Sequence, residues 1–164
     1  MNQRNAVIVY LLDEGNILLA KSNYRQGKIT WNGISGYIEK HESPEQAAIR
    51  ELYEEIKVRV YESDLEKAGV IHHKLLKNNA LINDFSMTIF TCRRWQGEPT
   101  ITPGIVPQWY SYEDIPYTDM FDDDKEWLPK VLDHEQVIVE VVSTEDDQTG
   151  EKTITSVSVR DILG

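Results

Sequence analysis

Acidic side chains gather in one short segment of the chain, where Glu51, Glu54 and Glu55 stand three and four residues apart. On a helix, Glu54 lies about 60° to one side of Glu51 and Glu55 about 40° to the other, so the carboxyl groups crowd into one sector. Like charges at this spacing repel one another and raise their own pKa values unless a cation lies among them. Mg²⁺ prefers carboxylate oxygens and also binds phosphate groups. The spacing therefore predicts a divalent-cation site that could serve phosphate chemistry.

Arg50 and Glu42 extend this acidic cluster toward the loop that precedes it. Arg50 stands beside Glu51 and four residues before Glu54, and its guanidinium can hold the Glu42 carboxylate through two parallel hydrogen bonds. Such a contact would fix the loop, which carries Gly36, against the helix. A Glu-x-x-Glu-Glu run alone also fits a solvated acidic face with i,i+4 pairs. The glycine-bearing loop and the Arg50-Glu51 pair favour a functional site instead.

The segment resembles the signature of the Nudix hydrolases: a glycine, five residues, a glutamate, seven residues, then Arg-Glu-aliphatic-x-Glu-Glu-x-Gly-aliphatic. The residues that match it are Gly36, Glu42, Arg50, Glu51, Leu52, Glu54, Glu55 and Val58. The chain departs from the signature at Lys57, where the family usually has a glycine that ends the helix in a left-handed turn. Either Lys57 adopts this strained conformation or the helix runs on.

The resemblance implies a Mg²⁺-dependent hydrolase, with Mn²⁺ as an alternative metal ion. The metal ligands that it implies are Glu51, Glu54, Glu55 and the backbone carbonyl of Ser35. The implied catalytic residues are Glu54, Glu55 and Arg50, with one of the two glutamates orienting the attacking water. Gly36 and Glu42 have structural roles in the signature.

Outside the signature, the chain resembles the MutT-homologue branch of the family, the oxidised purine nucleoside triphosphatases (8-oxo-dGTP diphosphatases). The likeness lies in the stretches 31–33, 108–110 and 114–129. It implies that Asn32, Asp123 and Asp124 read the edge of the base, and that Phe121 stands where this branch places a stacking tryptophan. Two adjacent carboxyl groups in a partly desolvated pocket cannot both ionise easily, so one should hold a proton near neutral pH. Alternatively, Asp122, Asp123 and Asp124 only cap and charge the N-terminus of the next helix.

The implied reaction is hydrolysis of an oxidised purine nucleotide such as 8-oxo-dGTP to the monophosphate and pyrophosphate, a step of nucleotide-pool sanitation. Two alternatives stay open. One is a Nudix pyrophosphatase that acts on an ordinary nucleoside triphosphate, a dinucleoside polyphosphate or a nucleotide sugar. The other is a nucleotide-binding module with weakened catalysis. It is favoured by Lys57 and by Gly104, which stands where this branch has a further metal-binding acid.

A helix and a sheet are needed to position these residues. Ser43 as N-cap, Pro44 at the first helical position and Gln46 three residues after the cap predict a helix from Pro44 to about Val58. A second helix is predicted at Asp123–Leu132, where Pro129 would kink or shorten it. The predicted extended segments are Ala6–Leu12, Ile17–Lys21, Trp31–Glu39, Ala68–Leu75, Leu81–Arg93, Val106–Tyr110, Val137–Ser143 and Thr153–Val159. We expect an α/β fold, a Nudix-type α/β/α sandwich with a mixed sheet between helices, in one domain over residues 1–164.

Composition limits the partners and the location. Among 164 residues, 17 Lys and Arg face 28 Asp and Glu, and the net charge of −11 argues against binding to a nucleic-acid polymer. The partner expected from the resemblance is a small nucleotide. The single cysteine, Cys92, excludes an internal disulfide and fits a reducing compartment. The apolar run Ala6–Leu12 is too short to span a bilayer and has no signal-peptide cleavage site. We therefore expect a cytoplasmic monomer without membrane contact.

Overall fold

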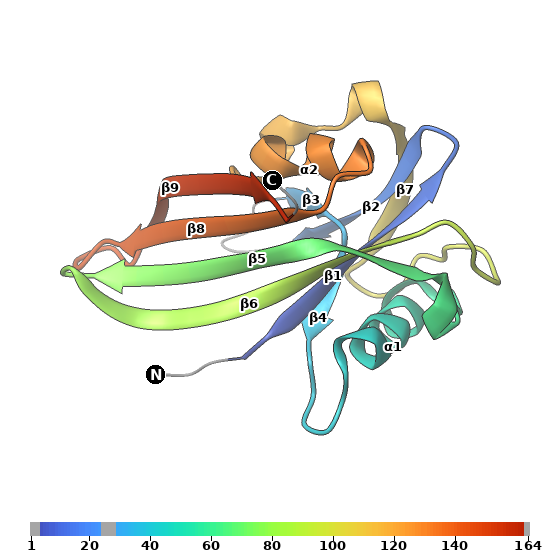
Figure 1. Ribbon diagram of the computed structural model, residues 1–164, viewed down its shortest axis with the longest axis horizontal. Helices are drawn as coiled ribbons and strands as arrows, with labels where there is room; N and C mark the ends of the chain where they lie inside the picture. Colours follow the sequence, from blue (N-terminus) through green and yellow to red (C-terminus); the bar gives the residue numbers. More distant parts are fainter. Residues whose placement is uncertain (1–3, 24–28, 163–164) are drawn as a thin grey trace.

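The computed structural model describes residues 4–23 and 29–162, and within them nine strands form one mixed sheet (Figure 1). The elements in chain order are β1 (Ala6–Asp13), β2 (Asn16–Asn23), β3 (Ile29–Asn32), β4 (Ile34–Tyr37), α1 (Pro44–Ile56), η1 (Glu62–Asp64), β5 (Leu65–Lys77), β6 (Ala80–Cys92), β7 (Val106–Ser111), η2 (Tyr112–Asp114), η3 (Tyr117–Asp119), α2 (Asp124–Leu132), β8 (Val137–Glu145) and β9 (Lys152–Asp161). Neither α-helix in these ranges has the length and apolar composition that crossing a membrane requires.

Strand β1 is central to the sheet, whose order is β3-β2-β1-β6-β5-β8-β9, with β4 also paired to β1 and β7 to β2. Strands β1 and β6 pair in parallel, as do β5 and β8, whereas the hairpin neighbours pair antiparallel. Every residue from Ala6 to Leu12 is buried. Because successive side chains of a strand point to opposite faces, burial of the whole run requires cover on both faces of the sheet.

The two α-helices supply that cover from opposite sides (Figure 1). Ile8, Tyr10 and Leu12 belong to a hydrophobic layer that includes Trp127 and Leu128 of α2. The alternate residues of β1, Val7, Val9 and Leu11, belong to a second layer that includes Leu52 and Ile56 of α1. This arrangement confirms the predicted α/β/α sandwich.

Helix α1 begins as its sequence predicts. The Ser43 side chain accepts a hydrogen bond from the Gln46 amide at 3.1 Å, and the Gln46 side chain accepts one from the Ser43 amide at 2.8 Å. The helix ends at Ile56, two residues earlier than predicted. Lys57 takes the left-handed conformation, with φ 62° and ψ 30°, and its amide donates to the carbonyl oxygens of Leu52 and Tyr53. Of the two expectations for this position, the strained conformation is therefore the one observed.

The remaining predicted elements are present with shifted ends. Strand β5 is longer at both ends than predicted, because it pairs with β6 on one side and β8 on the other. Helix α2 keeps Pro129 in its interior and still reaches Leu132. The Trp31–Glu39 segment divides at Gly33 into β3 and β4. A Cβ at Gly33 would lie within 3 Å of the Tyr10 ring, so this residue has no room for a side chain.

Candidate active site

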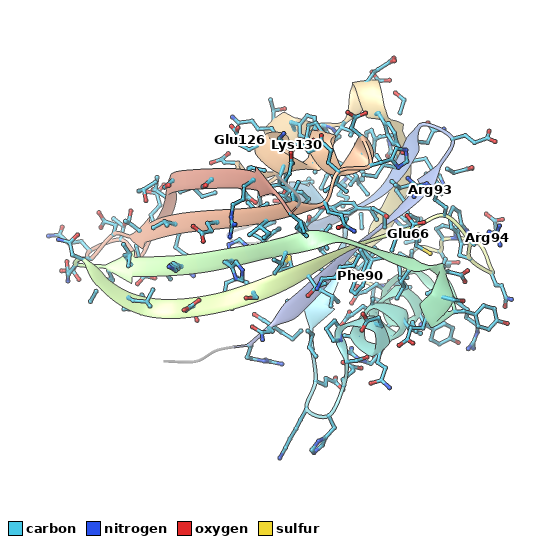
Figure 2. The ribbon with its side chains drawn as sticks, in the orientation of Figure 1. Glu66, Phe90, Arg93, Arg94, Glu126 and Lys130 are labelled. Carbon is cyan, nitrogen blue, oxygen red and sulfur yellow. The ribbon has the colours of Figure 1, made fainter. Side chains whose placement is uncertain are left out.

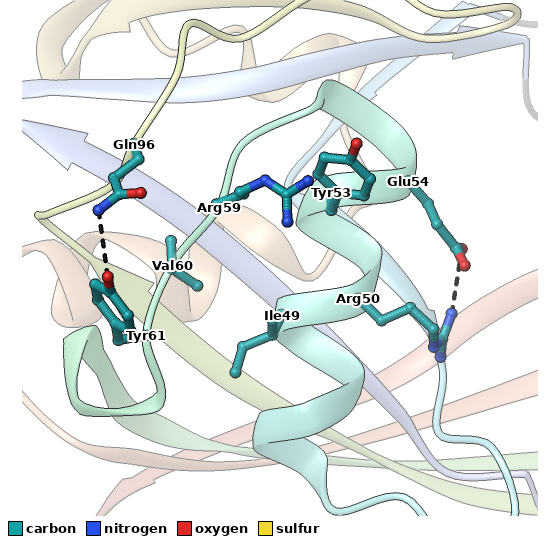
Figure 3. Close-up of a pocket in the computed structure, with 8 residues that line it drawn as sticks. All are labelled: Ile49, Arg50, Tyr53, Glu54, Arg59, Val60, Tyr61 and Gln96. Carbon is teal, nitrogen blue, oxygen red and sulfur yellow. Dashed lines mark hydrogen bonds and ion pairs between the residues drawn. The ribbon is translucent and has the colours of Figure 1, made fainter.

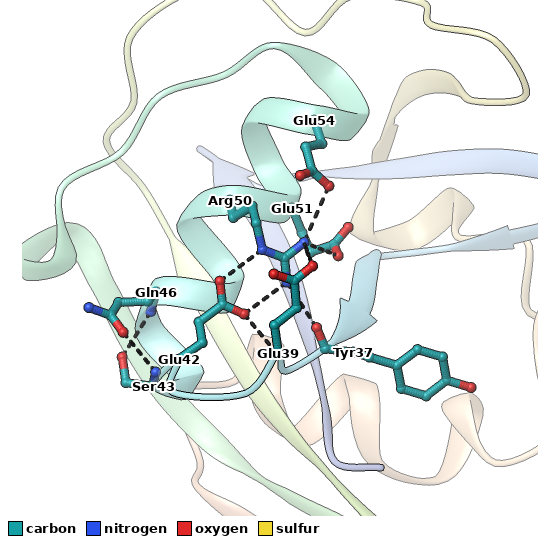
Figure 4. A network of polar contacts seen from close by, with 8 residues as sticks. All are labelled: Tyr37, Glu39, Glu42, Ser43, Gln46, Arg50, Glu51 and Glu54. Atoms are coloured by element: carbon teal, nitrogen blue, oxygen red, sulfur yellow. Dashed lines mark hydrogen bonds and ion pairs between the residues drawn. The ribbon is translucent and has the colours of Figure 1, made fainter.

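Arg50 joins the loop before α1 to the helix itself (Figure 4). Its Nε donates to Glu42 Oε2 at 2.8 Å and its Nη2 to Glu42 Oε1 at 2.9 Å, which confirms the predicted bidentate contact. Nη2 also donates to the Tyr37 carbonyl oxygen at 2.9 Å, at the end of β4. The hydrogen bonds from Arg50 lower the pKa of Glu42 to about 2. The entry loop is thus fixed against the helix by an ionised carboxylate.

The same guanidinium reaches two of the clustered acids. Arg50 Nη1 donates to Glu51 Oε1 at 2.8 Å and to Glu54 Oε2 at 3.2 Å. Glu51 is buried, and its pKa is raised because desolvation outweighs the attraction of Arg50. Glu54 is exposed. Burial followed by the charge of Glu54 also raises the pKa of Glu55. The charge of Glu54 therefore adds to the effect of burial on the pKa values of Glu51 and Glu55.

The absence of a side chain at Gly36 leaves room for the Glu51 carboxylate. A Cβ at residue 36 would overlap the carboxyl group of Glu51, so any larger residue would force that side chain to move. Gly36 lies on β4, opposite Val7 of the central strand. At Gly36, strand β4 thus places backbone without a side chain against the Glu51 carboxylate of α1. This contact explains the structural role predicted for Gly36.

A small pocket of about 130 Å³ brings together three of the predicted site residues, Asn32, Ser35 and Glu55. The remaining residues that line it are Ala20, Ser22, Gly33, Ile34 and Ile105. The Asn32 side-chain oxygen accepts a hydrogen bond from the Gly33 amide at 2.9 Å. The segment after β6 closes this region, since Thr102 Oγ1 donates to the Glu55 carbonyl oxygen at 2.6 Å. Gly104 lies on this segment, exposed and with φ 84°.

The donor set fits a hard divalent cation. It consists of oxygen atoms, and the carboxyl groups of Glu51 and Glu55 both have raised pKa values, so added positive charge beside them would be favourable. Within residues 4–23 and 29–162, however, no three potential ligand side chains converge as they would around an ion. The Arg50 guanidinium occupies oxygens of Glu51 and Glu54 instead. Binding a cation there would require these side chains to turn, and the ligand roles stay predictions.

The two acids at the start of α2 form a separate buried pair. Trp127 Nε1 donates to Asp123 Oδ2 at 2.9 Å, and the Phe121 amide donates to Asp124 Oδ2 at 3.2 Å. Burial and the charge of Asp123 raise the pKa of Asp124 well above its usual value, in agreement with the proton expected on one of the two carboxyl groups. Asp123 is the N-cap residue, yet within the described residues its side chain makes no capping hydrogen bond. Capping therefore does not explain this acid.

Tyr10 is the residue of this region that sequence reasoning missed. Its side chain is fully buried beneath Gly33 and makes an edge contact with Trp127, with ring centroids 6.2 Å apart. Its hydroxyl lacks a hydrogen-bond partner among the residues that the structure describes. The only clue in the sequence is a polar-tipped side chain inside an apolar run. In the same described part of the chain, no hydrogen bond joins Asn32 to Asp123 or Asp124, so their joint reading of a base stays a prediction.

Comparison with known proteins identifies relatives of this chain. The NUDIX domain family model matches residues 1–131. The oxidized purine nucleoside triphosphate hydrolase of Danio rerio is 33% identical over 125 residues, which cover 76% of this chain and 77% of that protein. The protein of the same name from Mus musculus is 29% identical over 155 residues, covering 94% and 93%. The crystal structure of the Mutator MutT protein from Bacillus halodurans superposes with a TM-score of 0.74 at 16% identity, covering 95% and 97%. These matches confirm the resemblance drawn from the residues, and the last supports the fold.

Proposed function

This chain belongs to the NUDIX domain family and is a Nudix hydrolase, and on that premise we propose that it hydrolyses oxidised purine nucleoside triphosphates such as 8-oxo-dGTP. The products would be the nucleoside monophosphate and pyrophosphate. The observation that carries the proposal is the network in which Arg50 ties the entry loop to Glu51 and Glu54 beside Gly36. The named relatives from Danio rerio and Mus musculus support the choice of substrate class.

A divalent cation, Mg²⁺ or Mn²⁺, would be held by Glu51, Glu54, Glu55 and the Ser35 carbonyl. When bound, it would neutralise phosphate charge and polarise the bridging oxygen. Glu55 is better suited than Glu54 to accept the proton of the attacking water. Its raised pKa favours proton uptake relative to an ordinary glutamate, whereas Glu54 is exposed and hydrogen-bonded to Arg50. Arg50 would keep the entry loop in position during this transfer through its two hydrogen bonds to Glu42.

Base recognition would depend on the acid pair at the start of α2. The raised pKa of Asp124 favours a neutral carboxyl group that donates a hydrogen bond. Asp123 accepts from Trp127 with one oxygen, which leaves the other to accept from a base. Asn32 and the ring of Phe121 would complete the contact with the purine.

The test of the hydrolase is pyrophosphate release from 8-oxo-dGTP with and without Mg²⁺. Glu55→Gln should lower kcat by at least about 100-fold, the usual contribution of a general base. Glu45→Gln, an acid in the first turn of the same helix, is the matched control and should behave as wild type. Equal background rates for wild type and Glu55→Gln would refute the proposal.

Substrate choice has its own test. The ratio of kcat/KM for 8-oxo-dGTP to that for dGTP should exceed one and fall in Asp123→Asn. A ratio of one in the wild type, or no effect of the substitution, would remove the oxidised base from the proposal while leaving the hydrolase.

We also propose that the chain acts as one domain over residues 1–164 and as a cytoplasmic monomer on the free nucleotide pool. Strands β8 and β9 lie beyond the matched residues 1–131 but continue the same sheet through β5. The net charge of −11 disfavours binding to nucleic-acid polymers and anionic membranes. Light scattering after size exclusion would test the monomer.

A further inference from the structure

A larger cavity, of about 450 Å³, lies on the outer side of α1 (Figure 3). We call it the outer-helix pocket, and its lining residues are Ile49, Arg50, Tyr53, Glu54, Arg59, Val60, Tyr61 and Gln96. Arg50 and Glu54 stand at one end and Tyr61 and Gln96 at the other (Figure 3). The pocket therefore begins at the acidic network and extends away from it. Its volume suits a small-molecule ligand.

Two cations converge on one aromatic ring in this region. The Arg59 guanidinium carbon lies 4.2 Å from the centroid of the Tyr53 ring, and Lys57 Nζ lies 5.1 Å from the same centroid. Within the described part of the chain, neither cation forms an ion pair, although acids exceed bases and the net charge is −11. A guanidinium that lies against a ring keeps its N–H groups free for an anion.

Hydrogen bonds fix the backbone at both of these residues. Arg59 and Gln96 exchange two backbone hydrogen bonds, of 3.0 and 2.8 Å. Lys57 occupies the left-handed turn after α1, where its amide bonds back to the helix. A residue other than glycine is strained in this conformation, and here it places a charged side chain beside Tyr53. These contacts fix the backbone from which both side chains extend.

The far end of the pocket offers an aromatic surface and polar groups. Tyr61 is 65% exposed, and its hydroxyl accepts a hydrogen bond from Gln96 Nε2 at 3.5 Å. A flat heterocycle can stack on such a ring, and an amide can bond to its polar edge. Phosphate groups are the natural partners of a free guanidinium.

We propose that the outer-helix pocket binds a nucleoside phosphate, with its phosphate on Arg59 and its base on Tyr61 and Gln96. The pocket shares Arg50 and Glu54 with the proposed catalytic residues at one end, whereas the residues assigned here to the ligand are not among the proposed catalytic or base-reading residues. Its ligand could reach it in two ways: as the distal nucleoside of a substrate whose phosphate chain starts at the acidic cluster, or as a separate nucleotide.

Calorimetric titration with AMP in EDTA tests the site without turnover. Arg59→Gln should weaken AMP binding at least about tenfold, the effect of losing a charge-assisted hydrogen bond, and Tyr61→Ser should also weaken it. Arg94→Gln removes the same charge from a neighbouring exposed position (Figure 2) and should change nothing. Unaltered binding in Arg59→Gln would overturn the proposal. So would loss of binding in Asp124→Asn, because AMP would then occupy the base-reading site.

Steady-state kinetics with Mg²⁺ separate the two sources. If the pocket takes the distal nucleoside, Arg59→Gln raises the KM for diadenosine tetraphosphate about tenfold and leaves the KM for 8-oxo-dGTP unchanged. If it takes a separate nucleotide, both KM values stay the same, and added AMP alters the rate of the wild type but not of Arg59→Gln. AMP binding at this pocket in a protein that hydrolyses neither compound would contradict the proposed function and support the pocket.

Discussion

Replacing Arg50 by methionine would remove the guanidinium while keeping most of the apolar stem, so the change isolates the charge network from packing. Of the carboxylates that pair with Arg50, the least exposed is Glu51, whose side chain is 9% exposed and whose Oε1 lies 2.8 Å from Arg50 Nη1. Removing one partner of a buried ion pair costs about 3–5 kcal/mol. Arg50 itself is 22% exposed, and water can replace part of its hydrogen bonding. We therefore expect a loss near the lower limit, about 3 kcal/mol at pH 7.

The dependence of this loss on pH identifies its cause. Arg50 lowers the pKa of Glu42 from 4.5 to about 2, so Glu42 stabilises the wild type above the unfolded pKa. That contribution disappears as the pH falls through the folded pKa. Without Arg50, the pKa of Glu51 should rise further, and the penalty of its charge should vanish as it takes up a proton. The difference in unfolding free energy between wild type and Arg50→Met should thus be largest near neutrality and shrink below the unfolded pKa.

Urea denaturation at several pH values in EDTA would measure this difference, and a thermal scan should show a fall of about 9 °C at pH 7. Arg93→Met is the matched control (Figure 2). Its guanidinium pairs with Glu66 at 2.8 Å, but the two side chains are 38% and 66% exposed, so a loss below about 1 kcal/mol is expected. Equal losses in the two variants, or a loss in Arg50→Met that is the same at every pH, would refute the reasoning.

Four other substitutions test separate features. Tyr10→Phe should keep or raise the unfolding temperature, because it deletes a buried hydroxyl that has no partner in the described residues; a clear decrease in a thermal scan would contradict this. Asp124→Asn should stabilise the protein increasingly as pH rises, since ionisation of a carboxyl group with a raised folded pKa destabilises the fold; thermal scans at several pH values with a constant offset would show otherwise. Gly36→Ala should cost about 1–3 kcal/mol in urea denaturation, because its Cβ meets the Glu51 carboxylate; wild-type stability would rule out that contact. Lys57→Gly should gain about 1 kcal/mol in the same assay by relieving the positive φ, and a loss would mean that the Lys57 side chain stabilises more than its backbone strain costs.

Local signals predicted the start of α1 but not its end. Ser43, Pro44 and Gln46 act on neighbouring backbone groups, so their effect can be read from the sequence. The end depends on a distant segment, because the Thr100 amide donates to the Ile56 carbonyl oxygen at 2.9 Å and Thr102 caps the Glu55 carbonyl. Those contacts satisfy the last helical carbonyls and allow Lys57 to leave the helix. Nothing near Lys57 in the sequence indicates them.

The candidate site likewise contains some features that the sequence predicts and others that depend on contacts between distant segments. The contact of Arg50 with Glu42 follows from charge, reach and helical spacing, and the structure contains it. The burial of Tyr10 beside Asp124 depends on how β1 packs against α2, which the sequence pattern leaves open. The outer-helix pocket likewise requires the pairing of Arg59 with Gln96, two residues far apart along the chain.

The position of Arg50 has a consequence for how the protein can adapt. Its guanidinium already satisfies oxygens of Glu51 and Glu54, so a cation that takes these oxygens exchanges one positive partner for another. The free energy that Arg50 contributes to the metal-free fold is then subtracted from the free energy of loading. The stability of the metal-free protein and its affinity for the metal ion therefore oppose each other. Lineages selected for higher stability should bind the metal ion more weakly, and the reverse.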